Sequence, residues 1–139
     1  MPQTPDTTAI TAGRNDSTAL SPTLWPNTVW ESSGLHEARK RATGFRADSF
    51  YARFGNPTVT QFESAIAELE GAESALAFGS GMGAISTLIL ALCSQGSHIV
   101  AQNNLYGATL SFLQGPCKRF GIDVTFVDPA IPGSFAAAV

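Results

Sequence analysis

The sequence predicts an α/β fold built around a parallel sheet. From residue 56 onward, short apolar segments alternate with longer segments of helical periodicity. Glycines or capping residues bound most of these segments, so strands and helices follow one another in turn. Because a helical crossover joins neighbouring parallel strands, this alternation is typical of a sheet that carries helices on both faces.

The first clear helix begins after Asn56, which is a good helix-capping residue. Pro57 stands in the first turn, and Thr58 with Gln61 matches the T-x-x-Q capping box. Gly71 stands where such a helix would end. Its apolar residues recur at helical spacing, and they are Val59, Phe62, Ile66 and Leu69.

Three strands and two helices are expected after this first helix. In order they are a buried strand at 74–78, a helix opened by the turn at 79–83 and ended by Gly96, a strand at 98–102, a helix at 108–120 and a strand at 122–127. The helix at 108–120 should be interrupted near Gly115-Pro116, because proline lacks an amide proton and clashes with the preceding turn. Another helix is expected to start within residues 135–139.

The N-terminal part of the sequence has a different character. Residues 1 to about 20 are rich in Thr, Pro, Asp and Asn, a composition that cannot bury itself, so we expect an arm that is disordered on its own. Residues 20–30 carry two prolines and two tryptophans, which indicates docking against another surface. A short helix is expected over 35–43. We therefore expect an arm over 1–55 and the start of an α/β domain over 56–139.

Composition excludes several classes of partner and site. Of the 139 residues, 44% are hydrophobic and only 14% are charged, which indicates buried faces such as those between subunits. The net charge of −3 and the absence of a basic cluster argue against nucleic-acid and membrane partners. Cys93 and Cys117 have no C-x-x-C spacing, so we expect no zinc site, no disulfide framework and a cytoplasmic location. No signal peptide or membrane-spanning segment is recognisable.

A glycine-rich turn, Gly79-Ser80-Gly81-Met82-Gly83-Ala84, follows a predicted strand and opens a helix. The first amides of a helix have no intrahelical partner and lie at the positive end of its dipole, so they can bind a phosphate. Alternatively, the glycines serve only to make a tight turn. The turn also matches the G-x-G-x-x-[GA] dinucleotide fingerprint, but no acidic residue for a ribose occurs between Glu73 and Asp123. A smaller phosphorylated cofactor fits better.

Two tyrosines and one arginine are further candidates for this site. Tyr106 follows the strand at 98–102, on the side where parallel sheets bind ligands, and its ring could stack on a flat cofactor. Arg53 could pair with a phosphate, with the hydroxyl of Tyr51 as a further donor. For each of these residues an ordinary loop position is the alternative. His36 and His98 have no metal-ligand neighbours, so we expect no metal site.

Six short motifs resemble, in order and spacing, those of the cysteine/methionine metabolism enzymes that use pyridoxal phosphate. They are Tyr51-Ala52-Arg53, Gly55-Asn56-Pro57-Thr58, Leu69-Glu70-Gly71-Ala72, Ser80-Gly81-Met82-Gly83-Ala84-Ile85, Leu105-Tyr106-Gly107-Ala108-Thr109 and Phe126-Val127-Asp128. The family includes cystathionine γ-synthase, cystathionine and methionine γ-lyases and the O-acylhomoserine sulfhydrylases. This resemblance implies the N-terminal part of the fold type I large domain, a three-layer α/β/α structure with a mostly parallel sheet, preceded by an extended arm.

The resemblance also implies roles for the candidate residues. Ser80 and the backbone of Gly81 and Met82 would cup the phosphate of pyridoxal 5′-phosphate. Tyr106 would stack on the pyridine ring and act as the catalytic residue that assists proton transfer or departure of the leaving group. The family acts on sulfur amino acids and related substrates by replacing or eliminating a group at the γ or, in some members, the β carbon.

Tyr51 and Arg53 would, by the same resemblance, reach the phosphate bound to a neighbouring subunit. The expected assembly is therefore a homo-oligomer, a dimer or a tetramer, in which residues 1–55 form an intersubunit segment. Methionine γ-lyases carry a cysteine where this sequence has Ala108. Residues 92–96 and 118–122 resemble O-succinylhomoserine sulfhydrylases, which often have phenylalanine at the position of Tyr106.

The family's cofactor lysine lies beyond the residues present here. Lys40 and Lys118 are the lysines of this sequence, and neither stands in the family's Ser/Thr-rich context. We therefore expect an N-terminal portion of a transsulfuration enzyme, such as one for O-acylhomoserine or cystathionine, that is incomplete alone. The alternatives are a non-catalytic remnant or phosphate-binding fragment and, less favoured, a nicotinamide dinucleotide-binding domain.

Overall fold

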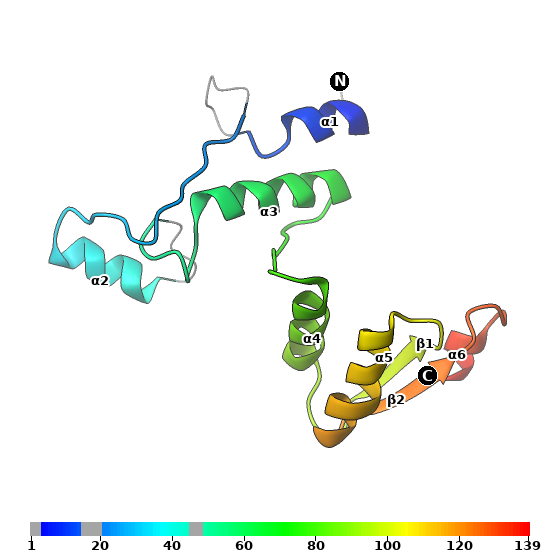
Figure 1. The fold of residues 1–139 in the computed structure, drawn as a ribbon. Coiled ribbons are helices and arrows are strands. Elements are labelled where there is room, and N and C mark those ends of the chain that lie inside the picture. Colours follow the sequence, from blue (N-terminus) through cyan, green and yellow to red (C-terminus); the bar gives the residue numbers. More distant parts are fainter. Residues whose placement is uncertain (1–3, 15–20, 45–48) are drawn as a thin grey trace. The chain divides into compact units, whose positions relative to one another are not determined.

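The computed structural model describes residues 4–14, 21–44 and 49–139, and the chain forms two compact units, Met1–Ala77 and Phe78–Val139 (Figure 1). The first unit contains the helices α1 (Pro5–Thr11), α2 (Leu35–Thr43) and α3 (Pro57–Glu70). The second contains α4 (Gly81–Leu92), β1 (His98–Gln102), α5 (Gly107–Phe112), the π-helical segment η1 (Leu113–Cys117), β2 (Asp123–Val127) and α6 (Ser134–Ala137). The predicted domain boundary after residue 55 stays a prediction about the whole protein.

The second unit is built on a parallel pair of strands. β1 and β2 pair from His98 opposite Asp123 to Gln102 opposite Val127, and α5 with η1 forms the crossover between them. Leu113, Cys117 and Ile122 form the buried core, with apolar side chains of both strands packed against them. Burial, together with the smaller effect of the Cys93 thiol, raises the pKa of Cys117. The predicted strands at 98–102 and 122–127 are thus confirmed, the second one residue shorter.

The crossover helix is interrupted at the predicted place. Pro116 lies inside η1, where the α-helical turn of α5 widens into a π-helical turn. Because proline cannot donate a backbone hydrogen bond, a wider turn accommodates it without ending the helix. The wider turn carries Leu113 and Cys117 into the core, so the interruption is part of the packing of this unit. The short helix α6 confirms the helix expected near the last residues.

The predicted strand at 74–78 is wrong. Residues 74–78 have no regular secondary structure, and the described residues contain a two-stranded sheet, β1 with β2. The amide of Ala77 donates instead to Oε1 of Glu63, at 2.8 Å, and Leu76 and Phe78 are exposed. A strand needs a neighbouring strand for its backbone groups, and here the Glu63 carboxylate replaces that partner at Ala77.

Helix α3 confirms the predicted start and end but not the capping box. Asn56 is the N-cap, and its Oδ1 accepts the amide of Thr58 at 2.9 Å. Gly71 ends the helix in the left-handed region, at φ 63°, and its amide and that of Ala72 bond back to the last turn. The buried residues of α3 are Glu63 and Ala67. The four apolar residues predicted from their spacing are exposed.

Part of the N-terminal arm forms a helix that packs on the rest of the first unit. The expectation that the arm is disordered on its own stays a prediction. Residues 5–11 form α1, with Thr4 as its N-cap. The helix packs on α3, and at Gly13 the backbone comes so close that an added Cβ would lie 2.5 Å from the carbonyl oxygen of Gln61. Threonine-rich segments have weak helix propensity, so this helix depends on its packing against α3. Residues 1–3 and 15–20 of the predicted arm lie outside the described residues.

Side chains at the start of α3 hold the backbone at residues 23–25. The hydroxyl of Thr58 accepts the amide of Trp25 at 2.8 Å and donates to the carbonyl of Thr23 at 3.3 Å. Nδ2 of Asn56 donates to the carbonyl of Trp25 at 2.9 Å. Both backbone groups of Trp25 are therefore paired by side chains. These bonds hold the backbone at residues 23–25 on the beginning of α3, whereas Leu24, Trp25 and Val29 stay exposed. The docking of the apolar side chains of residues 20–30 against another surface therefore stays a prediction.

Substitutions of Asn56 should separate its two roles. Asn56→Asp keeps the oxygen that caps α3 and loses the donor to Trp25, whereas Asn56→Ala loses both. We expect Asn56→Ala to lower the free energy of unfolding by about 1–2 kcal/mol and Asn56→Asp by about half as much. Urea unfolding followed by far-UV circular dichroism measures the difference. Asn104→Ala serves as the control, and an equal loss for both Asn56 variants would contradict the assignment of two roles.

Candidate functional site

The start of α4 has backbone amides without a hydrogen-bond partner. Ser80 is the N-cap, and its Oγ accepts the amide of Gly83 at 3.0 Å, while its carbonyl accepts the amide of Ala84 at 3.0 Å. Within the described residues, the amides of Gly81 and Met82 have no hydrogen-bond acceptor. Two adjacent donors at the positive end of a twelve-residue helix therefore remain available for a ligand.

Gly81 has open space where a side chain would stand. A Cβ added there would meet nothing within 4 Å, and its φ lies outside the left-handed region, so the fold of this chain does not require glycine at residue 81. A bare backbone is useful where a ligand has to come close to main-chain donors. Unpaired main-chain donors at a helix start without a side chain are groups of the kind that would hold a phosphate, such as that of pyridoxal phosphate.

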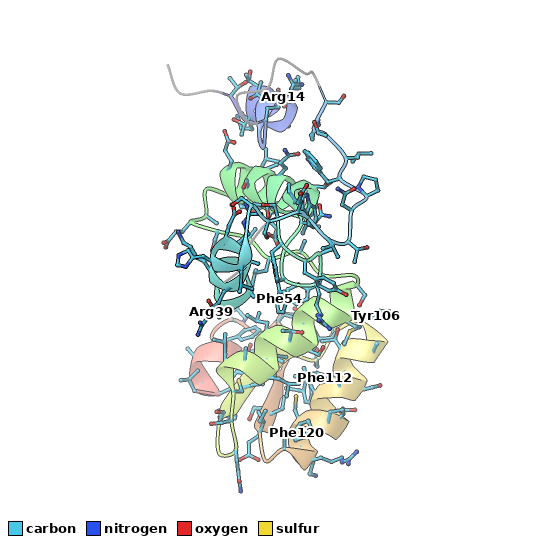
Figure 2. All side chains as sticks on the ribbon, turned by 90° about the vertical axis from the view of Figure 1, so that its left-hand side faces the viewer. Arg14, Arg39, Phe54, Tyr106, Phe112 and Phe120 are labelled. Atoms are coloured by element: carbon cyan, nitrogen blue, oxygen red, sulfur yellow. The ribbon has the colours of Figure 1, made fainter. Side chains whose placement is uncertain are left out.

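Tyr106 belongs to the start of α5, a helix whose first turn contacts the start of α4. It is the N-cap residue of α5, four residues after the carboxyl end of β1, and it is 74% exposed. Thr109, in the first turn of α5, donates from its Oγ1 to Sδ of Met82 at 3.4 Å, which brings the first turns of α5 and α4 into contact. Figure 2 shows Tyr106 at this end of the second unit. The sequence alone did not single out Thr109, which was named there only as the last residue of the motif Leu105-Tyr106-Gly107-Ala108-Thr109.

Tyr51 and Arg53 come together in the first unit. The guanidinium carbon of Arg53 lies 5.0 Å from the centroid of the Tyr51 ring and 5.5 Å from that of Phe54. The two rings meet edge to face, with their centroids 6.2 Å apart. An isolated antiparallel bridge joins Tyr51 to Val29. The aromatic rings thus support an exposed arginine that can bind an anion, and Phe54 is a residue that sequence reasoning missed.

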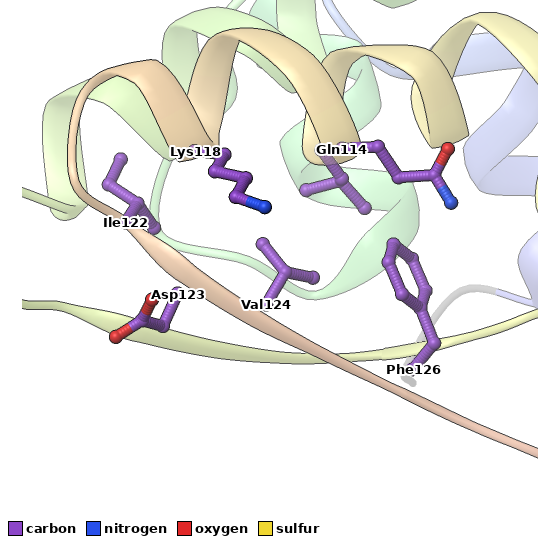
Figure 3. Close-up of a pocket in the computed structure, with 7 residues that line it drawn as sticks. Gln114, Lys118, Ile122, Asp123, Val124 and Phe126 are labelled. Atoms are coloured by element: carbon purple, nitrogen blue, oxygen red, sulfur yellow. The ribbon is translucent and has the colours of Figure 1, made fainter.

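Lys118 lies at the far end of the crossover helix from Tyr106. Figure 3 shows it at a cavity of about 340 Å³ between the end of η1 and β2, together with Asp123 and Gln114. Eleven residues of helix separate residues 107 and 118, which corresponds to about 16 Å along the axis. The one lysine of the second unit is therefore remote from the amides of Gly81 and Met82.

In the part of the chain that the structure describes, no three side chains of His, Cys, Asp or Glu gather as metal ligands would. His98 pairs through Nε2 with the hydroxyl of Thr125 at 2.7 Å, so it takes part in the packing of the strand pair. None of the helices within residues 4–14, 21–44 and 49–139 has the length and apolarity needed to cross a membrane.

The second unit is an α/β unit with a parallel strand pair, and its helix α4 opens with two unpaired amides. The family model described as Cys/Met metabolism PLP-dependent enzyme matches residues 6–139. The chain belongs to this family. The family resemblance predicted from the six motifs is thereby confirmed.

Curated relatives support this assignment. The chain is similar to an O-succinylhomoserine sulfhydrylase of Pseudomonas aeruginosa, with 38% identity over 87% of this chain and 30% of the relative. An L-methionine gamma-lyase of Porphyromonas gingivalis is 37% identical over 86% of this chain and 30% of its own length. Cystathionine gamma-synthase 1 of Arabidopsis thaliana is 42% identical over 72% of this chain and 17% of its own length. The chain thus spans about 30% of the length of the first two relatives.

Solved structures confirm the predicted fold class. A crystal structure described as an O-acetylhomoserine (thiol)-lyase of Campylobacter jejuni, with N'-pyridoxyl-lysine-5'-monophosphate, matches 99% of this chain and 35% of its own, at a TM-score of 0.85 and 25% identity. The crystal structure of metB from Corynebacterium glutamicum matches 99% of this chain and 34% of its own, at a TM-score of 0.84 and 28% identity. The chain therefore has the α/β fold of the N-terminal part of these enzymes.

Two substitutions should show that folding does not require glycine at position 81. Gly81→Val places its side chain in open space at an ordinary φ, so we expect the free energy of unfolding to change by less than about 1 kcal/mol. Gly71→Val is the matched control, because its side chain also meets nothing but its φ is 63°. The control should lose more than about 1 kcal/mol in urea unfolding. Equal losses would contradict a ligand-related reason for Gly81.

Proposed function

We propose that this chain contributes a phosphate-binding site for pyridoxal 5′-phosphate to an enzyme of sulfur amino acid metabolism. The proposal depends chiefly on one observation, which is that the amides of Gly81 and Met82 are unpaired at a helix start where residue 81 has no side chain. Membership of a pyridoxal-phosphate-dependent family supports it. The absence of an acidic residue between Glu73 and Asp123 disfavours a dinucleotide at the same turn.

The residues of the second unit have separate tasks in this proposal. Ser80 caps Gly83 and so keeps the first turn of α4 formed, while the amides of Gly81 and Met82 donate to the phosphate. Tyr106 presents an exposed ring that stacks on the cofactor, and its hydroxyl can move a proton at the reacting group. Bound pyridoxal phosphate supplies an electron-accepting ring for the chemistry on an amino acid substrate.

The activity proposed for the whole protein is transsulfuration. It would replace or eliminate a group at the γ carbon of a homoserine-derived substrate such as an O-acylhomoserine or cystathionine. The names of the relatives, which include O-succinylhomoserine sulfhydrylase, O-acetyl-L-homoserine sulfhydrylase and cystathionine gamma-synthase, support this range of substrates. Methionine γ-lyases carry a cysteine at the position of Ala108, so the alanine disfavours methionine as the substrate.

The position of Lys118 favours a second candidate for the chain taken alone, which is a phosphate-binding fragment without catalysis. A lysine attached to the cofactor would have to reach the site beside Tyr106. Lys118 lies at the opposite end of the crossover helix, beside a different cavity. Residues 1–139 can then bind the phosphate group but cannot hold the cofactor covalently at this site through the second unit.

Binding without a covalent bond can be tested with pyridoxal 5′-phosphate and the 139-residue chain. We expect weak binding, seen as a change in the cofactor's absorbance, that Gly81→Val reduces and that free pyridoxal, which lacks the phosphate, does not reproduce. Borohydride reduction followed by mass spectrometry should then show no stoichiometric attachment to a single lysine. Stoichiometric attachment at Lys40 or Lys118, lost in Gly81→Val, would contradict the fragment hypothesis.

We further propose that Tyr51 and Arg53 bind the phosphate at a second copy of the chain, within a homo-oligomer. The support is the exposed guanidinium of Arg53 held between two aromatic rings, together with the resemblance of the Tyr51 motif to that of the family. A site of this kind needs groups from two chains.

Mixing two variants tests this shared site. Arg53→Ala and Gly81→Val should each bind pyridoxal 5′-phosphate more weakly than the parent chain. After the two are unfolded together and refolded in equal amounts, mixed oligomers contain sites in which neither substitution is present. We expect tight sites to reappear in up to about a quarter of the chains for random pairing into dimers. No recovery, in a mixture shown by mass spectrometry to contain mixed oligomers, would contradict the shared site.

A further inference from the structure

The hydroxyl of Thr109 makes an unusual contact. Thr109 is 7% exposed, and a buried threonine in a helix commonly donates to a carbonyl of its own preceding turn. Here Oγ1 lies 3.4 Å from Sδ of Met82, on another helix. A thioether is a weak acceptor, but a buried hydroxyl needs some partner, so this contact links the two helices specifically.

Met82 stands at the centre of the proposed phosphate site. Its amide is one of the two unpaired donors, and its carbonyl accepts the hydroxyl of Ser86 at 2.7 Å. Its side chain reaches the first turn of α5, three residues after Tyr106. The Thr109 hydroxyl therefore meets the same residue whose amide would bind the phosphate, and it does so from the helix whose N-cap is Tyr106.

We propose that Thr109 is a positioning residue that sets the spacing between the amides of Gly81 and Met82 and the ring of Tyr106. A ligand with a phosphate and a flat ring has a fixed distance between these two parts, so its affinity depends on how well the two helix starts are held. The inference rests on the proposed function, because the phosphate and the ring are those of pyridoxal 5′-phosphate.

Four variants test this role by their affinity for pyridoxal 5′-phosphate and for inorganic phosphate. Thr109→Val removes the hydroxyl at nearly constant volume, Thr109→Ser keeps it, and Met82→Leu removes the sulfur acceptor. Thr125→Val is the matched control, because it removes the hydroxyl that pairs with His98 in the same unit. We expect Thr109→Val to weaken pyridoxal 5′-phosphate binding by about 3- to 10-fold and inorganic phosphate binding by less than about 2-fold. Thr109→Ser and Thr125→Val should stay within about 2-fold of the parent.

The double variant Thr109→Val/Met82→Leu shows whether the hydroxyl acts through the sulfur. If it does, the double variant binds no more weakly than Thr109→Val alone, because both substitutions break the same contact. The inference would be overturned if Thr109→Val weakened the binding of both ligands equally, or if it left the affinity for pyridoxal 5′-phosphate unchanged. If circular dichroism shows that Thr109→Val does not fold, Met82→Leu is measured in its place. An unchanged affinity of Met82→Leu for pyridoxal 5′-phosphate would then overturn the inference. A parent chain that binds neither ligand would instead overturn the proposed function.

Discussion

The unsatisfied amides at the start of α4 are the constraint on which the rest of the site depends. A helix leaves its first amides without partners, and Ser80 satisfies one of them at Gly83. The cap thereby holds the turn while the amides of Gly81 and Met82 stay free. Because Gly81 has no side chain and the space at its Cβ position is open, a ligand could approach these donors, and the proposed phosphate site depends on this.

In the first unit, side chains of α3 and its N-cap form hydrogen bonds with backbone groups that a neighbouring strand would pair in a sheet. Asn56 and Thr58 pair both backbone groups of Trp25, and the Glu63 carboxylate accepts the amide of Ala77. These three residues all belong to the N-cap or the first two turns of α3. Helix α3 is therefore the element that organises the irregular segments before and after it, which explains how a unit without a described sheet keeps a defined backbone path.

Much apolar surface of both units lies exposed. On α3 this surface includes Phe62 and Leu69, and on α4 it includes Leu88 and Leu92. Exposed apolar faces of this extent are typical of surfaces that contact other protein. They agree with the low charge of the sequence, and with a chain that spans about 30% of the length of its curated relatives. A stripe of apolar residues identifies a face that avoids water, but not the element that covers it.

Local chemistry determined the elements that the sequence predicted correctly. The cap at Asn56, the left-handed end at Gly71 and the interruption at Pro116 each follow from groups within a few residues of one another. The helix start at Ser80 is of the same kind. The strand predicted at 74–78 is wrong because a strand requires a neighbouring strand, which a local sequence pattern does not reveal. No local pattern shows either that the Glu63 carboxylate, fourteen residues earlier, accepts the amide of Ala77.

The candidate site residues likewise include some that the sequence indicates and some that only the tertiary structure reveals. Ser80, Gly81, Met82, Tyr106, Tyr51 and Arg53 could be proposed from motif and residue type. The contacts of Thr109 with Met82 and of Phe54 with Arg53 required the tertiary structure. A buried hydroxyl or an exposed aromatic ring has many suitable partners in a sequence, and only the packing of one element against another selects the partner it meets.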